Sequence, residues 1–136
     1  LSIQDPIGAG LENIGLPLLN NFNAKQYQAH PNNFDAVQDG NGWMYFANLW
    51  GVVEFNGTSW RTLSLPNGVS CTSLACDKNG NVFASGPGGV WVFDKNGKVL
   101  GKIKIPVPVS NCGFSSDGKT VYLTADMYVL RVKLHQ

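Results

Sequence analysis

DGNG at residues 39–42 and DKNG at 77–80 are two copies of one turn, and together they decide how the chain folds. A looser copy, SSDG, stands at 115–118, and the final glycines of the three turns are 38 residues apart. Asx-Gly pairs supply the positive φ angles that tight hairpin turns need. Each turn lies between two runs of alternating or apolar residues, so each one predicts a β-hairpin.

The same spacing continues beyond the turns. GVVEF at 51–55 aligns with GVWVF at 89–93, and MYVLR at 127–131 fits as a third copy at the same offset. The repeats show no helical periodicity. The predicted strands are 35–38, 43–48, 52–56 and 59–65, then 73–76, 82–85, 90–94 and 99–105, and finally 111–114, 120–124 and 128–134. A repeated four-stranded unit of about 40 residues is typical of β-propeller blades.

We therefore predict an all-β fold, a β-propeller domain over residues 15–136, with residues 1–14 as a leader or poorly ordered segment. The three four-stranded blades span 34–66, 67–106 and 107–136. The third unit ends after its third strand, so it lacks an outer strand. Residues 15–23, GLPLLNNFN, provide a spare strand before the first blade.

Closure of the ring is the main constraint on assembly. Known propellers have about four blades or more, so three blades leave sheet faces and an edge strand open. A symmetric homodimer would close a six-bladed ring, with residues 15–23 of each chain completing the last blade of its partner. A trimer, or a fragment cut from a longer chain, are the alternatives.

Composition excludes several classes of partner. The net charge is +1, only 14% of residues are charged, and no block of like charge occurs, which argues against nucleic acid and acidic membrane surfaces as partners. No apolar run approaches the length of a membrane span. The three cysteines make an odd count without CxxC spacing, so we predict no disulfide framework, and we expect Cys76 and Cys112 to be small buried hydrophobic residues.

Several stretches around the first unit carry a resemblance to a known family. They are GLP at 15–17, NF at 21–22, Tyr27, HP at 30–31, NF at 33–34, AVQDGNGWMYFAN at 36–48 and GVVEFNGTSWR at 51–61. Through these motifs, residues 15–66 resemble the first blade of two-component regulator propeller repeats, which are extracytoplasmic sensor regions of bacterial hybrid histidine kinases. The resemblance implies an opening blade with an N-terminal closing strand, and a periplasmic or extracellular location.

A second resemblance covers the rest of the chain. It rests on DKNGNVF at 77–83, GPGGVWVFDKNGKVLG at 86–101, NCGF at 111–114 and DGKTVYLTA at 117–125. Residues 67–136 resemble the C-terminal blades of the senescence-marker/gluconolactonase/lactone-hydrolase family. That family is six-bladed and holds a divalent metal, often calcium, in its channel on a Glu, two Asn and a catalytic Asp. The residue that aligns with this Asp, five before Asp77, is Thr72, so the resemblance supports the fold more than the chemistry.

Five residues form the predicted ligand-binding face at the channel mouth: Asn33, Asp35, Trp50, Ser73 and Asn111. Asp35, Ser73 and Asn111 occupy equivalent repeat positions, at the starts of the predicted inner strands. Asp35 and Asn111 carry hard oxygen ligands suited to Ca²⁺ or Mg²⁺, which makes them the predicted metal ligands. The alternative is that these side chains hydrogen-bond to neighbouring blades or ordered waters, which we favour.

Aromatic residues and histidines complete the inventory of candidates. Trp43, Trp60 and Trp91 fall within strand patterns and are expected in the core. Trp50 lies in a loop, where an exposed ring could stack on a sugar or meet a partner. The alternatives are that it plugs the channel mouth or packs across the dimer seam. His30 precedes Pro31 at a blade entrance and has no nucleophile motif beside it, so we expect a turn residue rather than a general base.

These observations favour one function over two others. We expect a non-catalytic propeller scaffold or ligand-binding module, assembled as a homodimer, that binds a small polar ligand or carbohydrate at the channel face. The first alternative is a calcium-dependent, gluconolactonase-like lactone hydrolase with its site at the dimer axis. The second is a fragment of an extracytoplasmic two-component sensor.

Overall fold

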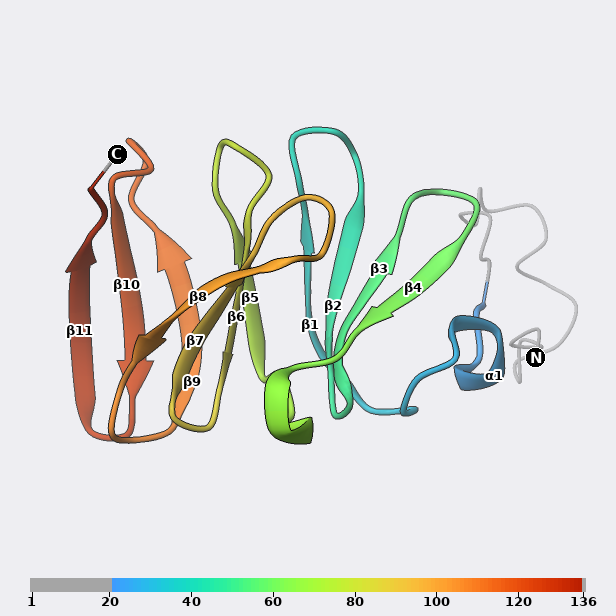
Figure 1. Ribbon diagram of the computed structural model, residues 1–136, viewed down its shortest axis with the longest axis horizontal. Helices are drawn as coiled ribbons and strands as arrows, with labels where there is room; N and C mark the ends of the chain where they lie inside the picture. The colour runs from blue at the N-terminus through green and yellow to red at the C-terminus, as the bar shows by residue number, and fades with distance from the viewer. Residues whose placement is uncertain (1–20, 136) are drawn as a thin grey trace, which may run out of the picture.

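Three antiparallel β-sheets stand side by side in the computed structural model, which describes residues 21–135 (Figure 1). The first sheet holds β1 (Asn33–Gln38), β2 (Met44–Asn48), β3 (Gly51–Phe55) and β4 (Trp60–Leu63). The second holds β5 (Ser73–Cys76), β6 (Val82–Gly86), β7 (Gly89–Phe93) and β8 (Val99–Lys104), and the third β9 (Val109–Phe114), β10 (Thr120–Ala125) and β11 (Tyr128–Lys133). Every predicted strand overlaps an observed one, so the three-blade prediction is confirmed.

The turns form as their sequence predicts. In the first blade, Asp39 Oδ1 accepts hydrogen bonds from the backbone N–H groups of Asn41 and Trp43, at 2.8 and 2.9 Å. Asp77 Oδ1 makes the equivalent pair of bonds in the second blade. Gly80 has a φ of 80°, the left-handed conformation for which glycine is selected at this position.

The third turn is one residue longer than the others, and this corrects the predicted register. Ser115 N–H donates to the carbonyl of Thr120, whereas Asp77 N–H donates to Asn81, one residue nearer in sequence. The pair at the far end of the hairpin is Gly86 with Gly89 in the second blade and Ala125 with Tyr128 in the third. The offset is therefore 39 residues for β10 and β11, and the predicted 38-residue match of 127–131 is wrong.

Two apolar cores join the three blades. The core between the first and second blades contains Tyr45, Ala47, Val52, Leu63, Leu65, Cys71, Leu74, Val82, Ala84 and Phe93. The core between the second and third contains Ala75, Phe83, Val90, Val109, Cys112, Val121, Leu123 and Ala125. Because successive side chains on a strand alternate between faces, each sheet presents one face to each neighbour. The middle blade is thus buried on both faces.

One sheet face recurs in all three blades but is covered in only two. It carries an aromatic residue on the second strand and a valine on the third. The equivalent pairs are Tyr45 with Val52, Phe83 with Val90, and Tyr122 with Val129. The first two pairs are buried against the following blade, whereas Tyr122 is 45% exposed and Val129 77% exposed. The third blade therefore ends in an open face of the inter-blade type.

The described part of the N-terminal segment covers the opposite open face, that of the first blade. A short helix, α1 (Ala24–Tyr27), begins at a capping box on Asn23. Tyr27 is buried against Val53, and the Phe22 ring packs on Trp60 at 5.1 Å between centroids. The predicted closing strand, 15–23, lies mostly outside the described residues, as does the predicted leader, 1–14. Among residues 21–135, no helix is both long and apolar enough to cross a membrane.

Candidate functional site

The three repeat-equivalent polar residues lie on neighbouring inner strands. Asp35 is on β1, Ser73 on β5 and Asn111 on β9, and these first strands of the three blades are neighbours in space. Ser73 Oγ donates to Asn111 Oδ1 at 2.7 Å. The structure therefore brings Ser73 and Asn111 into contact.

Each of the first two residues binds the backbone of the next blade. Asp35 Oδ2 accepts a hydrogen bond from Leu74 N–H at 3.0 Å. Cys112 N–H donates both to Asn111 Oδ1 at 2.7 Å and to Ser73 Oγ of the preceding blade at 3.3 Å. Leu74 and Cys112 are themselves equivalent positions in the repeat. An inner strand has no strand partner on its channel side, so its N–H groups need other acceptors. These side chains supply them, as expected for a structural role.

The second oxygen of Asp35 is also used, because Oδ1 accepts from the N–H of Ala36 at 2.8 Å. Both carboxylate oxygens thus receive backbone donors, which reduces what they can offer to a cation. Within residues 21–135, no three or more His, Cys, Asp or Glu side chains gather into a group that could hold a metal. Calcium binding by Asp35 and Asn111 stays a prediction.

Asn33 belongs to a different cluster, around the buried side chain of Asn48. Asn48 Nδ2 donates to Asn33 Oδ1 at 2.8 Å and to the carbonyl of His30 at 2.7 Å. Asn33 Nδ2 in turn donates to the hydroxyl of Tyr27 at 3.3 Å. Sequence reasoning missed Asn48, although an Asn that ends a strand beside a loop is a recognisable signal for side-chain-to-backbone bonding.

Trp50 is bonded to Asn48 through its backbone, and its ring is exposed. Its backbone N–H donates to Asn48 Oδ1 at 2.9 Å, and its indole meets the His30 ring edge-on, with centroids 5.4 Å apart. His30 Nδ1 accepts from Asn32 N–H at 3.1 Å, so in the neutral ring the proton resides on Nε2. Trp50 is 57% exposed. The arrangement offers a held aromatic face and a ring nitrogen donor beside it.

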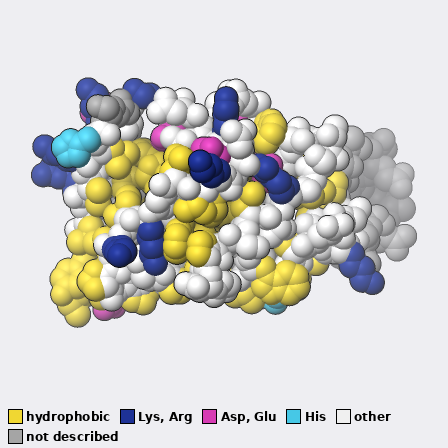
Figure 2. Space-filling model, viewed as in Figure 1, with side chains coloured by type: hydrophobic (Ala, Val, Ile, Leu, Met, Phe, Trp, Pro, Cys, Tyr) yellow, Lys and Arg dark blue, Asp and Glu magenta, His cyan; other side chains and the backbone are white. Residues whose placement is uncertain are grey.

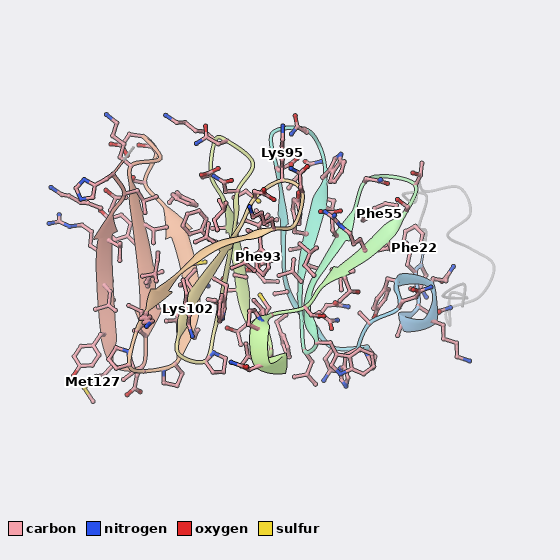
Figure 3. All side chains as sticks on the ribbon, in the orientation of Figure 1. Phe22, Phe55, Phe93, Lys95, Lys102 and Met127 are labelled. Atoms are coloured by element: carbon pink, nitrogen blue, oxygen red, sulfur yellow. The ribbon has the colours of Figure 1, made fainter. Side chains whose placement is uncertain are left out.

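The loops around Trp50 form an apolar end of the molecule. Hydrophobic side chains gather along the lower edge of the space-filling view (Figure 2), and Met127 lies at its left end (Figure 3). The exposed large hydrophobic residues between the second and third strands, or at the start of the third, are Leu49, Trp50, Met127 and Tyr128. We call these four residues the loop-end surface. Such a surface is suited to stacking and contact rather than to acid–base chemistry.

The cysteines offer no nucleophile. All three are free, Cys71 and Cys112 are buried, and Cys76 is partly buried, broadly as the sequence predicts. Burial raises the pKa of the Cys112 thiol to about 11, so it stays protonated at neutral pH. Burial also raises the pKa of Cys76, to about 12.

Comparison with known proteins supports both resemblances. No family model matches the chain. A gluconolactonase from Zymomonas mobilis is 41% identical over 71 residues, which are 51% of this chain but only 18% of that protein. The chain therefore spans less than a fifth of the curated relative it matches.

Solved structures share the fold. A gluconolactonase from Xanthomonas campestris aligns with a TM-score of 0.68 and 21% identity, over 76% of this chain and 38% of that one. The extracellular domain of a hybrid two-component system from B. thetaiotaomicron aligns with a TM-score of 0.68 and 19% identity, over 82% of this chain and 17% of that domain. The chain is thus a β-propeller portion that resembles gluconolactonases and extracellular sensor propellers.

The bond between Asp35 and Leu74 predicts a measurable cost when it is removed. Asp35→Ala removes the acceptor of two backbone N–H groups, those of the buried Leu74 and of Ala36, which follows Asp35 in the chain. We therefore expect a loss of about 2 kcal/mol in the free energy of unfolding. Asp35→Asn keeps one side-chain acceptor and should lose about half as much. Urea denaturation monitored by tryptophan fluorescence measures both. Equal stability of the Ala variant and the wild type would show that water replaces the carboxylate.

Proposed function

We propose that this chain is a non-catalytic propeller module, half of a six-bladed ring that two copies close, with a binding site for a small polar ligand or carbohydrate at the loop-end surface. The observation that carries the proposal is the open face of the third blade. It has the pattern of the two faces that the following blades cover, and no described residue covers it.

A second copy supplies the matching surface. In the proposed ring, the first blade of one copy follows the third blade of the other, as the second blade follows the first within a chain. Its inner strand β1 carries the Ala36 N–H, which is equivalent to the Leu74 N–H of the second blade. Asn111 stands where Asp35 and Ser73 stand in the preceding blades. In the single chain Ala36 N–H donates to Asp35 Oδ1, and Asn111 Oδ1 accepts from Ser73 Oγ and Cys112 N–H. We expect Ala36 N–H of one copy to share its hydrogen with Asn111 of the other, which continues the inner-strand bonds around the ring.

The unpaired edge of β11 favours the same assembly. β11 pairs with β10 alone among the described strands, so its outer edge is open to another strand. Phe22 and Tyr27 pack on the face of the first blade that the partner's third blade would meet, so closure requires that these two side chains lie in the seam between the copies. Residues 15–23, which include Phe22, form the segment that we expect to complete the partner's last blade.

The ligand part of the proposal rests on Trp50. An exposed tryptophan costs free energy in water, and this one is held by its backbone bond to Asn48 and by the His30 ring. Sugar rings stack their C–H faces on such indoles, while the His30 Nε2–H can donate to a hydroxyl. The closed dimer would carry two such platforms at the same end of the ring.

The sequence match to a gluconolactonase favours a second candidate, a calcium-dependent lactone hydrolase. In that reading Asp35 and Asn111 of both copies would hold the ion at the dimer axis. The backbone bonds that Asp35 accepts on both oxygens count against it. Likeness to extracellular sensor domains supports the remaining reading, a sensor fragment in a periplasmic or extracellular location.

Disruption of the open face should separate the two copies. We expect light scattering to give twice the chain mass of 14.7 kDa for the wild type and a single chain mass for Val129→Arg. Val129 is exposed in the single chain, so a charge costs little there, but it is buried unpaired in the dimer. Leu100→Arg, on the exposed outer strand β8, is the matched control and should stay dimeric. A wild-type monomer would refute the closure.

Removal of the indole should weaken binding at the loop end. We expect Trp50→Ala to weaken sugar binding by on the order of tenfold, because an aromatic contact contributes up to ~1.5 kcal/mol beyond its buried area. The measurement is a titration with glucose, galactose and N-acetylglucosamine, followed through the backbone amide resonances of Asn48 and Gly51 in all variants and, in the wild type, also through the Trp50 indole N–H resonance. Leu49→Ala, its exposed neighbour, controls for general loss of apolar surface. A Trp50 resonance that does not respond to any of the three sugars would contradict this part of the proposal.

Calcium separates the module from the hydrolase. If the chain is a non-catalytic module, calcium chloride and chelator should give the same melting temperature. A bound ion would instead raise it, because a ligand that binds only the folded state stabilises that state. The rise should then vanish in Asp35→Asn. Such a result, together with lactone hydrolysis, would replace the proposed function by the second candidate.

A further inference from the structure

A cavity of about 270 Å³ lies between the first two blades, at the end opposite the loop-end surface. It is formed by the turn between β1 and β2 and by the turn between β7 and β8, where Lys95 lies near the top of the view (Figure 3). Its lining residues are Asp39, Asn41, Trp43, Tyr45, Lys95 and Asn96. We call this space the turn-end cavity.

Tyr45, which lines the turn-end cavity, carries a hydroxyl that has no partner. Tyr45 is completely buried, and its hydroxyl oxygen makes no hydrogen bond. A buried polar group without a partner is costly, so such groups usually receive one from a ligand or an ordered molecule. Burial, together with the nearby Glu54 and Asp39 carboxylates, raises the pKa of Tyr45, so the phenol keeps its proton and can donate.

Asp39 adds an acceptor that its counterpart in the next blade lacks. In the second blade, Asn81 Nδ2 donates to Asp77 Oδ2 at 2.7 Å and so satisfies the second carboxylate oxygen. The residue equivalent to Asn81 in the first blade is Trp43, which bonds to Asp39 Oδ1 through its backbone only. No described residue donates a hydrogen bond to Asp39 Oδ2. Because the first blade has Trp43 where the second has Asn81, Asp39 Oδ2 remains available as an acceptor, and the Trp43 indole lines the same cavity.

The walls of the cavity are held in place. Arg61 pairs with Glu54 at 2.7 Å and donates from its other nitrogen to the carbonyl of Asn96 at 2.9 Å. A Cβ atom at Gly97 would lie 2.6 Å from the side chain of Leu63, so the turn sits closely against the first sheet. The site is thus preorganised, which lowers the entropy lost on binding.

We propose that the turn-end cavity binds a small polyhydroxylated ring, a monosaccharide or cyclic polyol. A hydroxyl group can accept from the Tyr45 phenol and donate to Asp39 Oδ2, while Trp43 offers an aromatic face and Asn41 and Asn96 line the remaining wall. The volume is just below the ~300 Å³ at which ligand pockets begin, which suits a single ring. One carboxylate beside a lysine is a poor cation site, and the carboxylate disfavours an anion.

This site is separate from the proposed function. It lies within one chain, at the other end of the blades from Trp50, so neither dimer closure nor the Trp50 platform is needed for it. The two inferences can therefore fail independently.

The test uses Tyr45→Phe and a matched control. The isotopically labelled chain is titrated with glucose, galactose and myo-inositol while the Trp43 indole N–H and the Asn41 amide are observed. We expect saturable shifts for at least one of the three, and binding weaker by about tenfold or more in Tyr45→Phe and in Asp39→Asn. Thr62→Val removes another buried hydroxyl without a partner, outside the cavity, and should leave binding unchanged.

Stability gives a second readout. Because the Tyr45 hydroxyl is unpaired without ligand, Tyr45→Phe should keep or raise the melting temperature of the free protein. Three results would overturn the proposal: no saturable shift at Trp43 with any of the three compounds, full binding by Tyr45→Phe, or a clear drop in its melting temperature. Trp50→Ala should leave the Trp43 shifts unchanged, and their loss in that variant would place the ligand at the loop end instead.

Discussion

The bonds between inner strands are the constraint on which the rest of the structure depends. Each inner strand leaves its channel-side N–H groups without a β-partner, and a side chain from the preceding blade accepts one of them: Asp35 for Leu74, and Ser73 for Cys112. These bonds fix the spacing between blades at the channel. The apolar cores then fill the space between neighbouring sheets. Asp35 and Ser73, which the sequence predicts to bind a ligand, therefore help to hold neighbouring blades together.

Repetition also explains the asymmetry of the molecule. The middle blade is packed on both sides, the first is covered by its own N-terminal segment around Tyr27, and the third remains open at Tyr122 and Val129. The face that packs neighbouring blades together is thus left uncovered by any described residue at the third blade. The two turns of the turn-end cavity show a second effect of repetition. In the second blade the Asn81 side chain donates to the second oxygen of the turn aspartate, Asp77. The first blade has Trp43 at the equivalent position, so the second oxygen of Asp39 receives no such bond.

Most of the fold could be predicted from the sequence, because turn residues and strand alternation are local signals that recur three times. The site could be predicted only in part. Asp35, Ser73 and Asn111 were recognised by their equivalent positions, but their backbone partners depend on how blades meet, which no local pattern encodes. Asn48 and the unpaired Tyr45 hydroxyl were missed for the same reason, since both depend on neighbours distant in the chain. The prediction of the register of the third hairpin was wrong, because its turn has one extra residue and the spacing of the glycines does not show it.

That extra residue has a consequence for how such chains can be rearranged. It reverses the in–out parity of β10 relative to a fixed 38-residue period, yet Val121 and Leu123 still point to the core, because the apolar positions are displaced with it. Parity is therefore a property of each hairpin and is set at its turn. If two blade segments are joined within the turn between a first and a second strand, the downstream segment brings its own turn and so keeps the correct alternation of its side chains. Blades joined at such turns could be exchanged between proteins without resetting the alternation of the strands that follow.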